Sequence, residues 1–246
     1  MNIDPAFAGF AVCVAIAFTT DASIGFGSML LGLTLGAQFY PISTILPWLL
    51  CMSVLMTSYM VLRHHEHIEF RLLATRVFPG MGAGMLVGSA IFSNVSEQGL
   101  RGFLGCFVIV TAFIELRRMV SAAHGSSRPL SGPVFAAITF AAGIVHGITA
   151  TSGPVLVYGV GRLGLHKSSF RSTLAVVWLT LNATLAFGFY MRGQLTAADL
   201  PTLGALAPIV GVSIVAGEWL HGRFEERTFR FVILAMLLVS GISLLA

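Results

Sequence analysis

His146-Gly-Ile-Thr-Ala-Thr-Ser-Gly-Pro154 separates an apolar run before it (134–145) from another after it (155–160). Backbone that leaves a helix inside a lipid bilayer must be enclosed by protein, because lipid offers no hydrogen-bond partners. A cluster of Thr, Ser, Gly and Pro at that depth is therefore costly, and a binding site is the usual reason for it. Residues 19–28 interrupt the first apolar run in the same way. We interpret the two interruptions as the two halves of one substrate site.

The composition is that of an integral membrane protein. The 246 residues are 56% hydrophobic and only 10% charged, with a mean hydropathy of +0.89, whereas soluble domains carry about 25% charged residues. Residues 1–4 lack the basic segment and cleavage site of a signal peptide, so we expect no cleaved leader. The three cysteines stand far apart inside apolar runs, so neither a disulfide framework nor a metal cluster is predicted, and no cofactor is expected.

Eight hydrophobic elements follow one another, and we predict an all-α fold that contains no strand. Six elements suit ordinary membrane spans of about 20 residues. The first and fifth are split by the interruptions into two short arms each. The apolar stretches are 6–18 with 29–37, 42–62, 77–92, 102–116, 132–145 with 155–161, 172–191, 203–220 and 229–246.

The chain also contains an internal repeat. Glu97-x-x-x-Arg101 recurs 129 residues later as Glu226-x-x-x-Arg230, and each precedes an apolar run. Two pairs of glycines support the repeat: Gly88 and Gly217 at the same spacing, and Gly27 and Gly153 at a spacing of 126 residues. We therefore predict a first repeat (1–120, with its broken element at 6–37), a cytoplasmic linker (121–133) and a second repeat (134–246, with its broken element at 132–163). Each repeat holds one broken element and three spans.

The distribution of Lys and Arg separates two topologies. If all eight elements cross the membrane, seven basic residues fall on each side, which the positive-inside rule does not favour. If residues 131–165 form a re-entrant hairpin, twelve fall on one side and only Arg101 and Arg192 on the other. By repeat similarity we expect the first broken element to be re-entrant from the opposite face, which makes the two repeats inverted. Eight kinked spans remain the alternative.

This topology predicts a multi-pass protein of the cytoplasmic (inner) membrane, with both termini on the outer side. The basic loops at 63–76, 117–128, 162–171 and 221–230 are then cytoplasmic.

A half-helix that begins at an interruption presents backbone N–H groups and the positive end of its dipole. Two such ends near the membrane midplane make a pocket for a small anion, lined by hydroxyls. The alternative is that the small residues serve close helix packing. The candidate substrate-binding residues are Thr19, Thr20, Ser23, Gly25, Gly27, Ser28, His146, Thr149, Thr151, Ser152, Gly153, Pro154 and Asn182.

Three polar side chains inside apolar elements have two interpretations each. Asp21 is a candidate for carrying a coupling proton or cation, or it is the N-cap of the arm that follows. His146 can donate to an anion or relay protons, or it is a packing histidine. Asn182 can complete the pocket, or it makes a hydrogen bond between helices. The cluster at 64–67 (His-His-Glu-His) is interpreted as a solvated loop, since no second set of metal ligands accompanies it.

These residues resemble the sulfite exporter TauE/SafE family, also called the 4-toluene sulfonate uptake permeases. Its members are similar to this chain in length and in two related halves, each opening with a Gly-rich break. Gly25-Phe26-Gly27 matches the first motif with Phe26 in place of the middle glycine, and Ser152-Gly153-Pro154 matches the second more closely. The opening of the next span (170–173) is also similar to the second half of the family.

The resemblance implies a transporter of sulfite, sulfonates or related sulfur-containing organic anions rather than an enzyme. We expect a secondary transporter that works by alternating access, with possible proton coupling through Asp21. Its partners are then the anion, the coupling ion and the lipid bilayer, with no nucleic acid. A passive anion channel is one alternative. An intramembrane hydrolase built on Ser152 and His146 is another, although the pair lies within a single interruption and lacks a Gly-x-Ser-Gly context.

Overall fold

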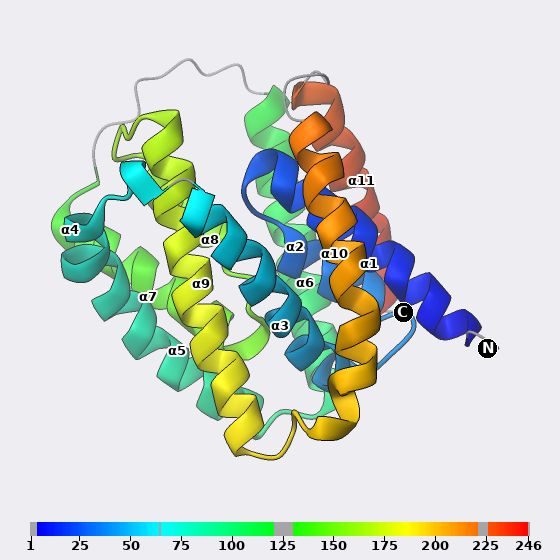
Figure 1. Ribbon diagram of the computed structural model, residues 1–246. Helices are drawn as coiled ribbons and strands as arrows, with labels where there is room; N and C mark the ends of the chain where they lie inside the picture. Colours follow the sequence, from blue (N-terminus) through cyan, green and yellow to red (C-terminus); the bar gives the residue numbers. More distant parts are fainter. Residues whose placement is uncertain (1–3, 64, 121–129, 221–225, 246) are drawn as a thin grey trace. The chain divides into compact units, whose positions relative to one another are not determined.

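A computed structural model describes residues 4–63, 65–120, 130–220 and 226–245, and in this part of the chain all regular structure is helical (Figure 1). Most of the predicted linker (121–129), His64 and part of the predicted basic loop at 221–230 lie outside the described residues. The helices are α1 (Pro5–Ile24), α2 (Ser28–Gly36), α3 (Ile42–Arg63), α4 (Phe70–Leu72), α5 (Phe78–Phe92), α6 (Glu97–Val120), α7 (Gly132–Thr149), α8 (Gly153–Gly161), α9 (Lys167–Met191), α10 (Leu200–Leu220) and α11 (Glu226–Leu245).

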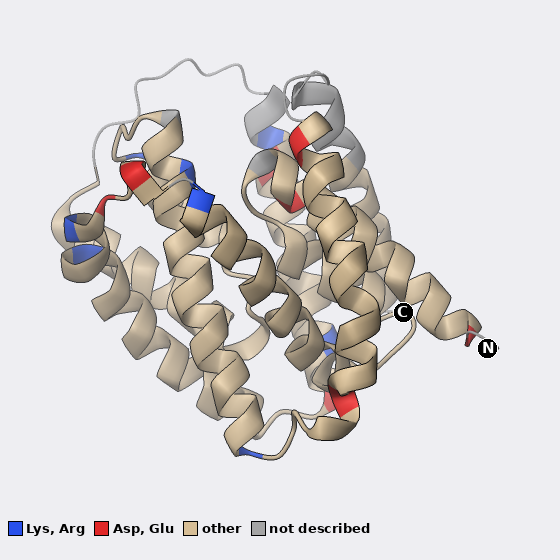
Figure 2. Ribbon diagram, in the orientation of Figure 1, with Lys and Arg blue, Asp and Glu red and all other residues tan. Residues whose placement is uncertain are grey.

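The helices are those of a membrane protein, which confirms the predicted fold class. Six of the described helices are long and apolar enough to cross a bilayer. Large apolar side chains point outward from these helices, with Leu62 77%, Phe187 63% and Val212 70% exposed, which suits contact with lipid. Figure 2 shows that most of the charged residues among those coloured lie near helix ends. The six segments are Pro5–Ser23, Ile42–Arg63, Glu97–Arg117, Gly132–Thr149, Ser168–Met191 and Ala197–Leu220.

The chain divides into two compact units, and each draws helices from both predicted repeats. Unit 1 consists of Met1–Ile45, Ser96–Ser126 and Pro208–Ala246, and unit 2 of Leu46–Val95 and Ser127–Ala207. Helices α3 and α10 pass from one unit into the other, and each has a proline inside it close to the passage, Pro47 and Pro208. The predicted repeat boundaries follow the sequence rather than these units, and they stay a prediction.

In unit 2, α5 and α7 run parallel with their backbones in direct contact. A Cβ added to Gly84 would lie 2.1 Å from the Phe140 carbonyl oxygen, and one on Gly147 would lie 2.3 Å from that of Met85. Only glycine permits this approach, as in the small-residue interfaces of membrane helices.

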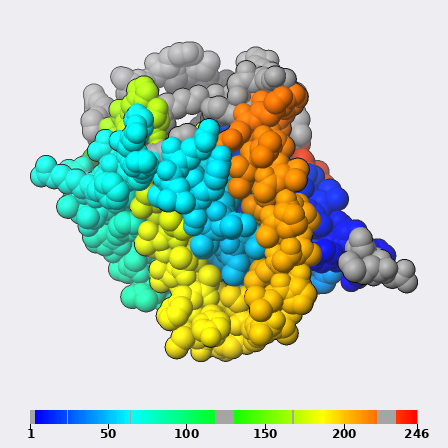
Figure 3. Space-filling model, in the orientation of Figure 1, coloured from blue at the N-terminus to red at the C-terminus, as the bar shows by residue number. Residues whose placement is uncertain are grey.

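Helices α3 and α9 of unit 2 run antiparallel. Asn182 Nδ2 of α9 donates to Ser53 Oγ of α3 at 2.8 Å. Arg171 Nη2 of α9 lies 3.7 Å from Met60 Sδ of α3. Because Arg171 precedes Asn182 on α9 while Met60 follows Ser53 on α3, the two helices run in opposite directions. Figure 3 shows these two segments, coloured cyan and yellow, side by side on one face.

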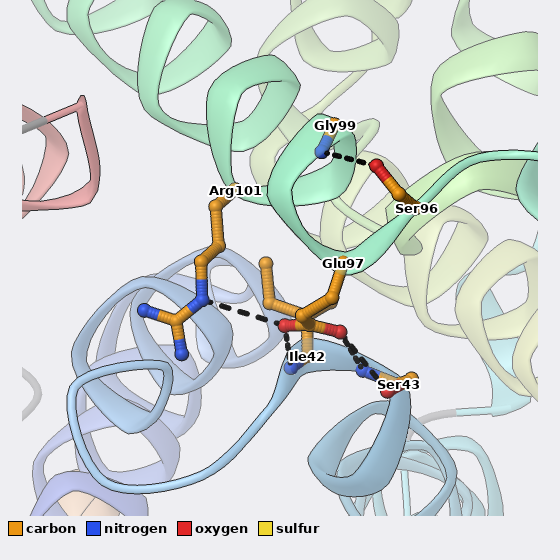
Figure 4. A network of polar contacts seen from close by, with 6 residues as sticks. All are labelled: Ile42, Ser43, Ser96, Glu97, Gly99 and Arg101. Carbon is orange, nitrogen blue, oxygen red and sulfur yellow. Dashed lines mark hydrogen bonds and ion pairs between the residues drawn. The ribbon is translucent and has the colours of Figure 1, made fainter.

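In unit 1, a carboxylate of one helix caps another. Glu97, the first residue of α6, accepts from the backbone N–H of Ile42 (2.6 Å) and of Ser43 (3.2 Å), and from Ser43 Oγ (2.9 Å) (Figure 4). The side chain thus satisfies the first N–H groups of α3, which have no partner within their own helix. Arg101 Nε lies 3.5 Å from Glu97 Oε1 on the next turn.

Several contacts relate residues at the repeat spacing. Gly88 of α5 packs on Gly147 of α7, and Gly217 of α10, 129 residues after Gly88, packs on Ala22 of α1. Ser53 and Asn182 are also 129 residues apart and touch each other, as residues close to a two-fold axis between repeats do. The predicted repeat and its inverted arrangement in the membrane both stay predictions.

The interruptions are narrower than the sequence suggested. Only 25–27 and 150–152 leave the helices, because residues 19–24 complete α1, and 146–149 complete α7. The prediction of two short arms around each break is therefore wrong for the first arms, which are 20 and 18 residues long. The second arms, α2 and α8, have nine residues each. At about 1.5 Å per residue they reach less than half of the roughly 30 Å hydrocarbon core.

Candidate functional site

The second break, Ala150-Thr151-Ser152, turns the chain from α7 into α8 within unit 2. Ala150 adopts a left-handed conformation (φ 56°, ψ 20°), and its N–H donates to the His146 carbonyl at 2.7 Å. A non-glycine residue in this region is uncommon and is held there by its surroundings. Gly153 and Pro154 form the start of α8 rather than part of the break.

His146 lies at the centre of this break and is completely buried. Its Nδ1 is 3.0 Å from Ser152 Oγ, and its ring is stacked on the indole of Trp178, with ring centroids 6.0 Å apart and planes 15° apart. When the Ser152 hydroxyl donates to Nδ1, the hydrogen of the neutral imidazole is on Nε2. Nε2 is then a hydrogen-bond donor.

Further buried hydroxyls and an amide complete the group. Thr149 Oγ1 and Thr151 Oγ1 are 2.7 Å apart, and both residues are at most 1% exposed. Asn182 lies close to His146, although no hydrogen bond of normal geometry joins the two side chains, since His146 Nε2 and Asn182 Oδ1 both lack one.

Three buried polar atoms in this cluster have no hydrogen-bond partner: His146 Nε2, Trp178 Nε1 and Asn182 Oδ1. Trp178 and Asn182 are four residues apart on α9, so they share one face of that helix, and both lie next to His146. Each unsatisfied buried group costs about 1–3 kcal/mol. Three such groups on neighbouring residues indicate a binding site for a ligand that supplies the missing hydrogen bonds.

The first break, Gly25-Phe26-Gly27, is satisfied by the chain itself. Gly25 and Gly27 are left-handed (φ 95° and 116°). Ser28 is the first residue of α2. The Asp21 carboxylate accepts from its hydroxyl and, at 3.2 Å, from its backbone N–H. Asp21 lies within α1, and the N-cap of α2 is Gly27, so the prediction that Asp21 is itself the N-cap of the following arm is wrong in position. Its side chain nevertheless accepts from the first N–H of α2. A role in coupling stays a prediction.

Other hydroxyls near the first break donate hydrogen bonds to backbone carbonyls. Thr20 Oγ1 donates to the Ile16 carbonyl at 2.8 Å. Ser23 Oγ lies 2.9 Å from the Thr19 carbonyl and 3.0 Å from that of Gly217 in α10.

Asp21 and His146 occupy like positions at the two breaks, one in each predicted repeat. The carbonyl of each accepts from the N–H of the left-handed residue that ends the first arm, Gly25 at 2.6 Å and Ala150 at 2.7 Å. The side chain of each reaches forward to a serine at the start of the next arm, Ser28 or Ser152. The two breaks therefore share their geometry but differ in charge, with a carboxylate in the first repeat and an imidazole in the second.

The structure brings the predicted residues together in two groups. His146, Thr149, Thr151, Ser152 and Asn182 gather in unit 2, where Ser53 and Trp178 join them. Thr20, Asp21, Ser23 and Ser28 belong to unit 1, and a single site formed by both breaks stays a prediction. Trp178 was not among the predicted site residues, although its position four residues before Asn182 places both on one face of a helix. The described residues contain no set of three His, Cys, Asp or Glu that could hold a metal ion.

Comparison with known proteins gives a family and two informative relatives. The family described as "Sulfite exporter TauE/SafE" matches residues 9–244. A Cupriavidus necator protein named "Probable sulfite/organosulfonate exporter TauE" is 23% identical over 231 residues, which cover 93% of this chain and 88% of the relative. A Comamonas testosteroni protein named "Probable inner membrane transporter protein TsaS" is 24% identical over 187 residues, covering 73% and 76%. No solved structure matches significantly. The chain is an integral membrane protein that belongs to the sulfite exporter TauE/SafE family.

Proposed function

We propose that this protein is a secondary transporter of a small sulfur-containing anion, sulfite or an organic sulfonate. The observation that carries the proposal is the group of unpartnered buried polar atoms around His146, at the break of a helix inside a membrane protein. Polar groups at that depth are retained where a substrate uses them. The names of the relatives, an organosulfonate exporter and an inner membrane transporter, support this substrate class and the cytoplasmic membrane as the location.

The proposed cycle is alternating access of two inverted repeats, with the breaks in the substrate path. Asp21 is proposed to carry the coupling proton. When its carboxyl is protonated, it loses charge at the Ser28 N–H and hydroxyl that it now caps. The start of α2 would then respond to protonation, which gives coupling a physical basis.

The pair Ser152 and His146 also favours a second candidate, an intramembrane serine hydrolase. Their separation of 3.0 Å satisfies the first requirement of a nucleophile and its base. In a full triad a third group orients the imidazole from its other nitrogen, and His146 Nε2 has no such partner. Transport is the better-supported function, in agreement with the family.

Anion flux into proteoliposomes containing the purified protein tests the proposal. Sulfite, thiosulfate, a sulfonate and a carboxylate are loaded separately, with and without an imposed pH gradient. We expect saturable flux of a sulfur anion that follows the gradient. Flux that does not saturate and ignores the gradient would indicate a channel, and no flux of any anion would refute transport of this class.

Two substitutions connect the flux to the second break. Ser152→Ala and Thr151→Val should weaken the apparent affinity for the anion while leaving some transport. A hydrolase would lose all activity with Ser152→Ala. If neither substitution changes the affinity, the substrate path lies elsewhere.

A further inference from the structure

We propose that the anion is held at the second break alone, by Trp178 Nε1–H and His146 Nε2–H as donors, and that Asn182 Oδ1 accepts a hydrogen carried by the anion. This inference rests on the proposed function and specifies its binding site. The ligand class is a small oxyanion that still bears one hydrogen, such as singly protonated sulfite.

The two donors follow from the contacts of the rings. The indole Nε1–H of Trp178 can only donate, and it is buried without a partner in a residue that is 8% exposed. His146 Nε2 becomes a donor when the Ser152 hydroxyl donates to Nδ1. Since the rings are stacked at 6.0 Å, the two donors belong to one neighbourhood. Two adjacent N–H groups match two oxygens of one anion, and hydrogen bonds to a charged acceptor are the stronger kind.

The acceptor comes from the amide of Asn182. Its Nδ2 donates to Ser53 Oγ at 2.8 Å, which leaves Oδ1 as a buried acceptor beside His146. The Nε2–H of His146 belongs to the neighbouring ring, but it makes no hydrogen bond with Oδ1 in this structure. A fully deprotonated oxyanion would place its own oxygen against this one. An anion that carries one hydrogen would satisfy all three atoms at once, which is the reason for assigning that class.

The first break cannot bind the anion in the same way, because a carboxylate of the chain already accepts the hydrogen bonds there. The Asp21 carboxylate accepts from the N–H and the hydroxyl of Ser28 at the position that corresponds to His146 and Ser152. A second negative charge beside this carboxylate would be repelled. The difference in charge between corresponding positions therefore directs the anion to the second break.

Binding of sulfite to the purified full-length chain, measured by titration calorimetry at a pH where sulfite is singly protonated, tests the donors. Trp178→Phe keeps a ring for the stacking but removes the N–H. We expect its affinity for sulfite to fall by about 10- to 100-fold, the range for a hydrogen bond to a charged group. Because that N–H has no partner in the chain, the melting temperature without ligand should fall only by the cost of the smaller ring, and by less than for a tryptophan whose N–H has a partner.

Trp48→Phe is the matched control in the same unit. The Trp48 Nε1–H donates to Asp199 Oδ1 at 2.8 Å, so its loss should lower the melting temperature and leave the sulfite affinity unchanged. If Trp178→Phe binds sulfite as tightly as the wild type, or loses stability as Trp48→Phe does, the assignment is refuted and water or packing explains the indole. If the wild type neither binds nor transports any anion, the proposed function itself fails.

Asn182→Leu tests the acceptor. Wild-type affinities are measured for singly protonated sulfite and for methanesulfonate, whose oxygens carry no hydrogen. We expect the substitution to weaken sulfite binding and to leave methanesulfonate binding less affected, so the ratio of the two affinities shifts toward methanesulfonate. An equal loss for both anions would mean that Asn182 only holds α9 against α3, and it would refute the acceptor role.

Discussion

The contact between α5 and α7 leads to a quantitative prediction about stability. Gly84→Ala adds a Cβ that would lie 2.1 Å from the Phe140 carbonyl oxygen and 2.8 Å from the Ile144 nitrogen. Real Cβ atoms essentially never come closer than 3.0 Å to such atoms. Since both obstacles are backbone, no side chain can rotate away, and the helices must separate by about 1 Å in a close-packed interior.

The expected cost is that of overpacking, about 1–3 kcal/mol, reduced by the better helix propensity of alanine, which is worth up to about 1 kcal/mol. Gly82→Ala is the control, because it makes the same change two residues earlier on α5, where nothing lies within 4 Å of the added Cβ. This control should be neutral or slightly stabilising. The difference between the two variants should therefore be about 1–3 kcal/mol in favour of Gly82→Ala.

Thermal unfolding of the purified variants in detergent, followed by the loss of helical circular dichroism, measures this difference. By the scaling of proteins of this length, each kcal/mol corresponds to about 2–4 °C in melting temperature. If Gly84→Ala melts at or above the temperature of Gly82→Ala, the close approach of α5 and α7 is refuted.

Three further predictions concern other parts of the chain. Glu97→Ala removes the carboxylate that caps α3 (Figure 4) and should cost about 0.5–2 kcal/mol in thermal unfolding, whereas Arg101→Ala should cost less than about 1 kcal/mol, because that ion pair is partly exposed. Asp21→Asn should abolish the dependence of transport on the pH gradient while sparing anion binding, because the amide oxygen can still cap Ser28; an unchanged gradient dependence in proteoliposomes would exclude Asp21 from coupling. Gly217→Ala should lower the melting temperature, because its Cβ would lie 2.3 Å from Ala22 Cβ, while Gly211→Ala, with nothing within 4 Å, should not. Equal melting temperatures would contradict the close packing of Gly217 on Ala22.

The membrane class and the positions of both breaks were predictable from the sequence. Hydropathy is a local property, and polar residues inside an apolar run stand out without any knowledge of their neighbours. The spacing that relates Glu97 to Glu226 could be read in the same way. The width of the breaks could not be predicted from the sequence, because Thr, Ser and Gly are tolerated in membrane helices as well as in loops. Residues 19–24 and 146–149 stay helical.

Composition and hydropathy were enough to predict a helical membrane protein whose apolar runs are interrupted at two places, because both properties are local. Which polar groups find hydrogen-bond partners depends on the folded arrangement. Asp21 finds its donor seven residues ahead, and Asn182 finds Ser53 129 residues away. Trp178 and His146 lie on different helices and are left with unpartnered nitrogen atoms. Hydrogen bonding depends on neighbours in space, and the order of residues along the chain does not specify these neighbours.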